Sequence, residues 1–123
     1  MVADDDKGIL KVVVAALRQL PMDVEIFTAG DGIEALEGIE ANKADLLILD
    51  VKMPRLDGFG VCEKLRKDIR TAFLPVLMLT ANSDQENRTK GYLVGTDDFV
   101  SKPFTIPDLV ARVSRLLRRT YGV

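Results

Sequence analysis

Histidine is absent from this chain, and cysteine occurs only once in its 123 residues. Without histidine the chain cannot form a Ser-His-Asp triad, a histidine-ligated metal site or a phosphohistidine. The single Cys62 excludes a disulfide within the chain and is typical of a protein from a reducing compartment. Because Cys62 falls within a helical pattern, we expect it to be a small core residue rather than a reactive thiol.

The sequence also lacks long apolar runs and a strong charge of either sign. No apolar stretch approaches the roughly 20 residues needed to span a bilayer, and the start of the chain (Asp4, Asp5, Asp6) is acidic, unlike a secretory signal. We therefore expect a cytoplasmic protein that makes no membrane contact. The net charge of −2 provides no general attraction to nucleic acid, so we expect no direct nucleic-acid binding.

The chain does contain enough apolar sequence for a folded core. Hydrophobic residues make up 47% of it and charged residues 29%, a balance typical of globular proteins rather than disordered ones. Its length corresponds to one domain, so we treat residues 1–123 as a single unit.

Short strand-like segments alternate with longer helical patterns along the chain. Strands are predicted at residues 2–3, 24–27, 46–49, 76–79 and 99–100. Helices are predicted at residues 8–20, 31–41, 58–67, 83–95 and 105–119, three of them opened by capping-box-like pairs at 31/34, 83/86 and 105/108. This (βα)₅ pattern predicts an α/β three-layer sandwich, with a five-stranded parallel sheet between two layers of helices. The first strand is unusually short, because only Val2 and Ala3 stand before Asp4.

The most informative residue is Asp50, which ends the apolar run 46–49 and precedes the loop that begins Val51-Lys52. Aspartate is rare in strands, whereas ligands gather at the carboxyl ends of the strands in open parallel sheets. Taken alone, Asp50 has two open interpretations: a cap that accepts hydrogen bonds from nearby amides, or a functional carboxylate.

Polar residues also follow the other strands. Asp4 and Asp5 end the first, Thr80 the fourth and Lys102 the fifth, so all of them should meet Asp50 at one edge of the sheet. Each has an ordinary interpretation as a helix-terminal charge, a strand end or a solvated side chain. Three clustered carboxylates would repel one another, and Mg²⁺, which prefers oxygen ligands, would relieve that repulsion. The coincidence of four strand ends favours the functional interpretation.

The chain resembles the response-regulator receiver domains of two-component signalling over essentially its whole length. The matching motifs are Val2-Ala3-Asp4-Asp5-Asp6, Leu49-Asp50-Val51-Lys52-Met53-Pro54 with Asp57-Gly58, Leu79-Thr80-Ala81 and Lys102-Pro103-Phe104. Each motif alone is weak, but their order and separations fit the family. The resemblance implies a flavodoxin-like sheet with strand order 2-1-3-4-5, here with a shortened first strand.

The same resemblance implies a role for each strand-end residue. Asp50 would accept a phosphoryl group from the phosphohistidine of a partner histidine kinase. Mg²⁺ would be held by Asp4, Asp5, Asp50 and the backbone carbonyl of Lys52. Lys102 and Thr80 would bind phosphoryl oxygens, and the bond between Lys102 and Pro103 is often cis in the family.

The resemblance also concerns two further properties: the conformational switch that follows phosphorylation and the lifetime of the phosphoryl group. Phe99 occupies the family's aromatic switch position, where the ring would follow Thr80 inward after phosphorylation; a static core aromatic is the alternative. In the family, the residues two positions after the acceptor and two after the threonine set the phosphoryl lifetime, and the resemblance places Lys52 and Asn82 there. Lys52 has three open interpretations: it hinders the hydrolytic water, which would slow autodephosphorylation; it weakens Mg²⁺ binding by charge repulsion; or it points to solvent.

Charges on the fourth helix, fifth strand and fifth helix resemble those of winged-helix transcription regulators. In that subfamily such charges form reciprocal salt bridges across a two-fold dimer, so we expect a phosphorylation-promoted homodimer. The residues concerned are Arg88, Asp97, Asp98, Asp108, Arg112 and Arg119. Ordinary pairing within one helix is the alternative for part of this set. The chain is either a stand-alone receiver or the receiver of a longer regulator with an effector domain after Val123.

Two other functions compete with this interpretation. A Mg²⁺-dependent phosphatase of the haloacid-dehalogenase type also uses a strand-end aspartate, but it requires a second aspartate at the position that Lys52 occupies. A pseudo-receiver, a pure interaction module, usually loses the acceptor or the acidic pair, and both are present here. We therefore expect a phosphoacceptor signalling domain rather than an enzyme.

Overall fold

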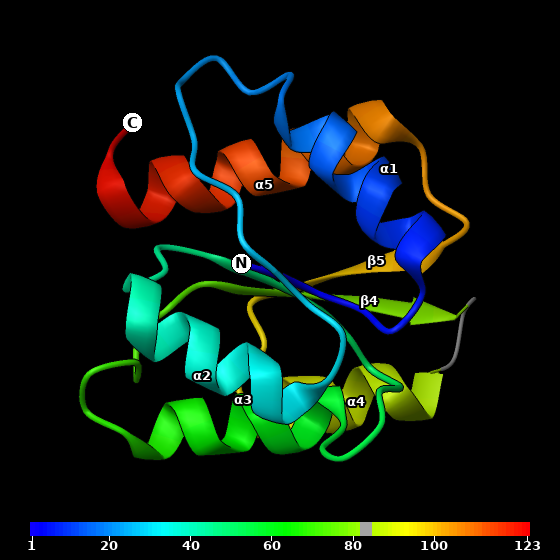
Figure 1. Ribbon diagram of the computed structural model, residues 1–123, viewed down its shortest axis with the longest axis vertical. Helices are drawn as coiled ribbons and strands as arrows, with labels where there is room; N and C mark the ends of the chain where they lie inside the picture. The colour runs from blue at the N-terminus through cyan, green and yellow to red at the C-terminus, as the bar shows by residue number, and fades with distance from the viewer. Residues whose placement is uncertain (82–84) are drawn as a thin grey trace.

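The computed structural model describes residues 1–81 and 85–123, in which strands and helices alternate along the chain (Figure 1). The strands are β1 (Val2–Ala3), β2 (Thr28–Ala29), β3 (Leu47–Asp50), β4 (Val76–Ala81) and β5 (Asp98–Lys102). The helices are α1 (Lys7–Leu17), α2 (Gly32–Asn42), α3 (Gly58–Lys67), α4 (Gln85–Val94) and α5 (Ile106–Tyr121). None of these helices is long and apolar enough to cross a membrane.

The strands form one sheet in the order β2-β1-β3-β4-β5, and every neighbouring pair is parallel. The predicted fold class and strand order are therefore confirmed. The register pairs Asp50 with Leu79, the residue before Thr80, and pairs Ala81 with Lys102. The carboxyl ends of β3, β4 and β5 thus lie at one edge of the sheet, as the sequence predicted.

Helices cover both faces of the sheet (Figure 1). On one face lie α1 and α5, and on the other lie α2, α3 and α4. β3 contributes to both apolar layers, because Leu47 and Leu49 belong to the cluster under α2 and α3 whereas Ile48 belongs to the cluster under α1 and α5. A strand buried on both faces must be apolar throughout, which explains the unbroken apolar run before Asp50.

Most predicted helix boundaries agree with the structure. α3 has the predicted bounds, and Asp31 and Thr105 cap α2 and α5 by accepting hydrogen bonds from the backbone N–H groups of Glu34 and Asp108. The α1 helix ends at Leu17 rather than at residue 20. The predicted cap at Ser83 and the lifetime position Asn82 lie outside the described residues.

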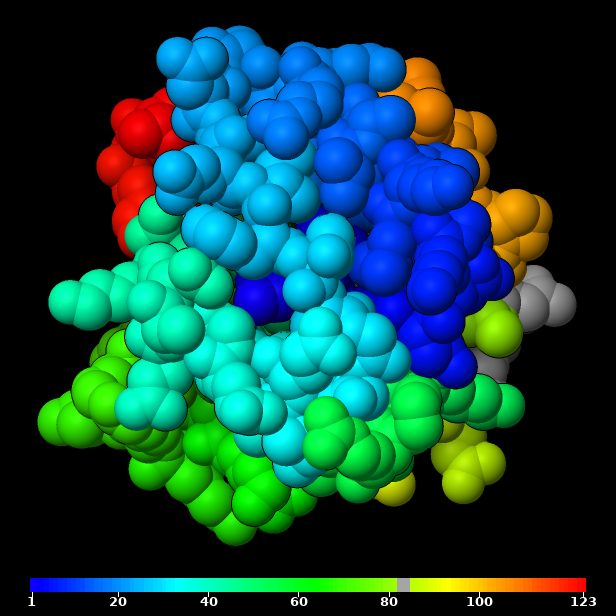
Figure 2. Space-filling model, viewed as in Figure 1, coloured from blue at the N-terminus to red at the C-terminus, as the bar shows by residue number. Residues whose placement is uncertain are grey.

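The predicted strand at residues 24–27 is wrong. The structure places β2 at Thr28–Ala29 instead, because β1 is two residues long and its register pairs only Val2 with Thr28 and Ala3 with Ala29. The carbonyl of Phe27 still accepts from the N–H of Val2 at 2.8 Å, but residues 24–26 extend past the start of β1, which only Met1 precedes. A cavity of about 430 Å³ opens there, between residues 22–27 and 42–46. Figure 2 shows a hollow on this face, floored by the dark-blue N-terminal end of the chain.

Candidate functional site

Asp50 is the last residue of β3, and the sheet almost completely buries it. Asp50 is 6% exposed. All four residues of β3 are buried, and the strand pairs with β4 along its whole length. The chain turns away immediately afterwards: the N–H of Gly58 donates to the carbonyl of Val51 at 2.8 Å. A Cβ on Gly58 would lie 2.4 Å from the carbonyl oxygen of Asp50. Glycine at position 58 therefore lets α3 begin directly against the backbone of the candidate acceptor.

Asp4 and Asp5 lie beside Asp50, as the sequence predicted. One carboxylate oxygen from each of the three residues lies within 4.8 Å of the others. Asp4 is fully buried, Asp5 is exposed, and Asp6 turns away to cap α1 through the N–H groups of Gly8 and Ile9. An oxygen-only donor set with one open side suits Mg²⁺, which is bound by few carboxylates and keeps several waters. The residues present thus fit the implied metal.

Lys102 supplies the positive charge of this site. Its Nζ atom donates to Asp4 Oδ2 at 3.0 Å and to Asp50 Oδ1 at 3.1 Å, so one ammonium group bridges two carboxylates. It ends β5, and the following bond to Pro103 is cis, as the family resemblance implies.

The charges at the site act on Asp50 in opposite directions. Burial and the neighbouring Asp4 carboxylate raise the pKa of Asp50 to about 6, although the Lys102 ammonium opposes the shift. Desolvation and a like charge both disfavour the ionised form of an acid. A bound cation would oppose both effects, so the site favours a metal at neutral pH.

Thr80 is buried without a hydrogen-bond partner for its hydroxyl. Its residue is fully buried, and Oγ1 accepts from and donates to no group in the described part of the chain. Buried hydroxyls are normally paired, because an unpaired one costs about 1–3 kcal/mol. Thr80 directly follows the register partner of Asp50 in the adjacent strand, so both residues stand at the carboxyl ends of neighbouring strands.

Phe99 lies inside the protein, beneath α4. It is 1% exposed and meets Tyr92 edge-to-face, with ring centroids 5.1 Å apart. The Arg88 guanidinium lies 5.5 Å from the centre of the Phe99 ring. A Cβ on Gly91 would lie 2.2 Å from Cζ of Phe99, so only glycine leaves room for the ring in this position.

The similarities to known proteins agree with this geometry. The family model for the response regulator receiver domain matches residues 1–114. The chain belongs to this family. Receiver domains are the signalling domains of two-component systems, so membership also argues against the phosphatase alternative.

Relatives with similar sequences are named as transcriptional regulators. This receiver domain is 42% identical over 120 residues to the DNA-binding dual master transcriptional regulator RpaA of Synechocystis, covering 98% of this chain and 49% of RpaA. It is 40% identical over 120 residues to the alkaline phosphatase synthesis transcriptional regulatory protein PhoP of Bacillus subtilis, covering 98% and 48%. The chain thus spans about half the length of the curated relatives it matches.

The solved structures include close matches to the fold. The receiver domain of the Francisella response regulator 1452 superimposes with a TM-score of 0.85 at 39% identity, over 97% of this chain and 95% of that one.

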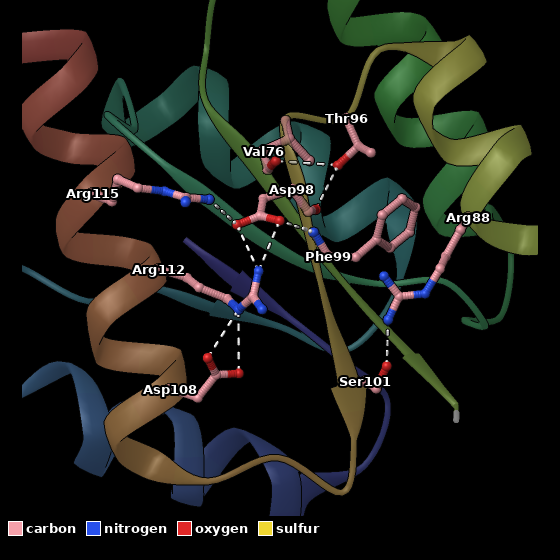
Figure 3. A network of polar contacts seen from close by, with 9 residues as sticks. All are labelled: Val76, Arg88, Thr96, Asp98, Phe99, Ser101, Asp108, Arg112 and Arg115. Atoms are coloured by element: carbon pink, nitrogen blue, oxygen red, sulfur yellow. Dashed lines mark hydrogen bonds and ion pairs between the residues drawn. The ribbon is translucent and has the colours of Figure 1, made fainter. Parts of the chain in front are cut away.

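The charges that we expected at a dimer interface are largely paired within this receiver domain (Figure 3). Asp98, which is 7% exposed, accepts hydrogen bonds from Arg112 and Arg115 of α5 and from the N–H of Phe99. Arg112 also pairs with Asp108, and Arg88 donates to the hydroxyl of Ser101. This network joins the β5 residues beside Phe99 to α4 and α5. The dimer itself stays a prediction.

The two remaining charges of that set behave differently. Asp97 accepts from the Arg66 guanidinium at 3.1 Å and from the N–H of Val76 at 2.8 Å, whereas Arg119 is exposed. Sequence reasoning missed Arg66, which also donates to four backbone carbonyls, those of Thr71, Ala72, Leu74 and Gly95. It also missed Arg115, although its three-residue spacing from Arg112 places both on one face of α5.

Proposed function

We propose that this receiver domain accepts a phosphoryl group on Asp50 from a histidine kinase in a cytoplasmic two-component phosphorelay. The observation that carries the proposal is the arrangement around Asp50: a buried carboxylate that shares one ammonium with Asp4, next to the strand whose Thr80 has a buried hydroxyl with no partner among the described residues. A purely structural carboxylate would not explain the free hydroxyl of Thr80.

In the proposed reaction, a carboxylate oxygen of Asp50 attacks the phosphorus of the donor. An O–P bond forms while the N–P bond to the kinase imidazole breaks, and the imidazole leaves with the electron pair. Asp4, Asp5, Asp50 and the carbonyl of Lys52 would hold Mg²⁺, which neutralises charge on the transferred group.

Lys102 and Thr80 would donate hydrogen bonds to the phosphoryl oxygens once the group is bound to Asp50. The ammonium of Lys102 is already 3.1 Å from Asp50 Oδ1, so it can follow the charge as it moves outward. The hydroxyl of Thr80 would gain the hydrogen bond that it lacks. Formation of that bond favours a state in which Thr80 lies nearer the site.

We further propose that this change is transmitted through Phe99 to the surface formed by α4, β5 and α5. Phe99 is held by contacts from Tyr92 and Arg88 of α4, and its own N–H is held by Asp98. A shift of Phe99 would therefore disturb Arg88 and Asp98 together and free charges for a partner. The proposed partners are a second copy of the domain and an effector domain of the kind that transcriptional regulators carry.

Phosphorylation by acetyl phosphate tests the acceptor assignment. We expect labelling of the wild type that requires Mg²⁺ and is abolished in Asp50→Asn. Asp57→Asn is a matched control, since Asp57 is an exposed N-cap and asparagine can keep the cap. Labelling that persists in Asp50→Asn would reject the acceptor, and no labelling of the wild type would favour a pure interaction module.

Light scattering with beryllofluoride tests the dimer separately. The phosphoryl analogue should convert the wild type to a dimer but leave Asp50→Asn monomeric. A wild type that stays monomeric at high concentration with the analogue bound would reject the homodimer without affecting the acceptor assignment.

A further inference from the structure

The loop between β3 and α3, residues 51–57, carries the Lys52 carbonyl that is proposed to bind Mg²⁺. Its two ends are firmly held. Val51 donates to the carbonyl of Leu79 and accepts from Gly58, and the side chains of Val51 and Met53 are buried. At the other end, Asp57 caps α3. Between these anchors, Pro54 and Arg55 are exposed and contribute nothing to the core.

The middle of the loop has an unfavourable backbone conformation at Arg55. Its φ is +66°, in the left-handed region that residues other than glycine rarely adopt. The side chain crowds the backbone there, so this conformation persists only if surrounding contacts stabilise it.

A salt bridge with Asp31 provides such a contact. Nε of Arg55 donates to Oδ2 of Asp31 at 2.9 Å, and Nη2 donates to Oδ1 at 3.0 Å. This two-pronged arrangement is the strongest geometry for an arginine and a carboxylate, and it fixes orientation as well as distance. The Asp31 side chain is only 15% exposed, whereas that of Arg55 is 58% exposed.

Asp31 is itself held rigidly, because it is the N-cap of α2. Its Oδ1 accepts from the N–H of Glu34 at 2.8 Å, and that hydrogen bond, together with Arg55, lowers the pKa of its carboxyl group. The next residue packs tightly against the same loop: a Cβ on Gly32 would lie 2.1 Å from the carbonyl oxygen of Leu56. The start of α2 thus touches the loop at two successive positions.

We propose that Asp31 and Arg55 form a clamp that positions the β3–α3 loop, and with it the Lys52 carbonyl, for Mg²⁺. The clamp joins the N-terminus of α2 to the exposed middle of the loop, at Pro54 and Arg55. Both residues are positioning residues, since neither lies in the cluster of carboxylates that would bind the metal. The proposal rests on the proposed function, because it assumes that Mg²⁺ binds at Asp50.

The direction in which Mg²⁺ affinity changes when Arg55 is replaced distinguishes a clamp from simple electrostatics. Arg55 is a cation on the metal-binding loop, so its removal should strengthen Mg²⁺ binding if only charge mattered. Arg55→Gly also relieves the unfavourable φ. A clamp predicts the opposite, because the loop carbonyl would no longer be held in place, as with other groups that orient metal ligands.

Isothermal titration calorimetry with Mg²⁺ at pH 7.5 would test the clamp, with urea unfolding in EDTA as a parallel readout of stability. We expect Arg55→Gly to weaken Mg²⁺ binding by about threefold to tenfold. Asp31→Asn, which can keep the α2 cap, should weaken it similarly. The double variant should be no weaker than either single variant, because the pair acts as a unit. The matched control is Arg70→Ala, which removes a comparably exposed arginine paired with Asp68 and Glu40.

Three outcomes would overturn the proposal. If Arg55→Gly binds Mg²⁺ as tightly as the wild type or more tightly, there is no clamp, and the proposed function stands. If Arg55→Gly weakens binding equally in the Asp31→Asn background, glycine flexibility rather than the pair is responsible. If the wild type itself binds no Mg²⁺ at millimolar concentration, the metal site of the proposed function fails, and the clamp fails with it.

Discussion

Replacing Asp50 with asparagine should stabilise the metal-free protein. In the wild type, burial and Asp4 raise the pKa of Asp50 to about 6, against about 3.9 in an unfolded chain. Each pKa unit corresponds to about 1.4 kcal/mol, so ionised Asp50 destabilises the folded state by up to about 3 kcal/mol at neutral pH. Asparagine has nearly the same shape, and its Oδ1 can still accept from Lys102. We therefore expect Asp50→Asn to raise the free energy of unfolding by about 1–3 kcal/mol at pH 7.5.

The gain in the free energy of unfolding that Asp50→Asn brings should increase as the pH rises. An acid whose pKa is raised in the folded state binds a proton more tightly when folded. Its contribution to stability is therefore fully present below about pH 4 and is lost as the pH rises through about 6. The difference between wild type and Asp50→Asn should be small at pH 4 and should reach its full size above pH 6.

Urea unfolding followed by far-ultraviolet circular dichroism measures this difference, since the chain has no tryptophan for fluorescence. The experiment is done in EDTA at pH 4.0 and 7.5 and repeated with Mg²⁺, which should stabilise only the wild type and so narrow the gap. Asp57→Asn, at an exposed cap, should change the unfolding free energy by less than about 0.5 kcal/mol. A metal-free Asp50→Asn that is no more stable than the wild type at pH 7.5, or a gap that is the same at both pH values, would refute the reasoning.

Three other changes test the phosphoryl lifetime and the packing around the switch. Lys52→Asn should shorten the half-life of the phosphorylated form about threefold, equivalent to about 0.7 kcal/mol of barrier; radiolabel release measures it, and an unchanged half-life would show that Lys52 does not hinder hydrolysis. Arg66→Met should lower the free energy of unfolding in urea by about 1–3 kcal/mol, because partly buried carbonyls lose their donor and Asp97 loses its cation. Gly91→Ala should destabilise the protein by about 1–3 kcal/mol, although alanine favours helices, since the new methyl group meets the Phe99 ring. Adding Phe99→Leu should restore part of the lost free energy of unfolding. A Gly91→Ala variant as stable as the wild type would show that the Phe99 ring can move aside.

Local patterns in the sequence accounted for most of the fold. The apolar run before Asp50 predicted a strand buried on both faces, and the structure places that strand in the middle of the sheet. The capping pairs at Asp31 and Thr105 predicted helix starts, because an N-cap and its amide partner lie within three residues of each other. Parallel topology then placed the strand ends together, so Asp4, Asp50 and Lys102 could be expected to meet.

Features that depend on distant partners could not be predicted in this way. The strand expected at residues 24–27 failed because strand formation requires a neighbour, and β1 begins too late to supply one. The charges assigned to a dimer found partners within the chain: Asp97 pairs with Arg66, 31 residues away. The sequence alone shows that such charges exist but not which of them face each other.

The sequence by itself determined most of the strands and helices and which side chains meet at the sheet edge, because both depend on local periodicity and on strand order. Only the tertiary structure showed the buried hydroxyl of Thr80 with no partner in the described part of the chain, the Phe99 ring against Gly91 and the pairing of Asp31 with Arg55 across 24 residues. Those features depend on register, burial and side-chain direction, which are decided when separate segments pack together.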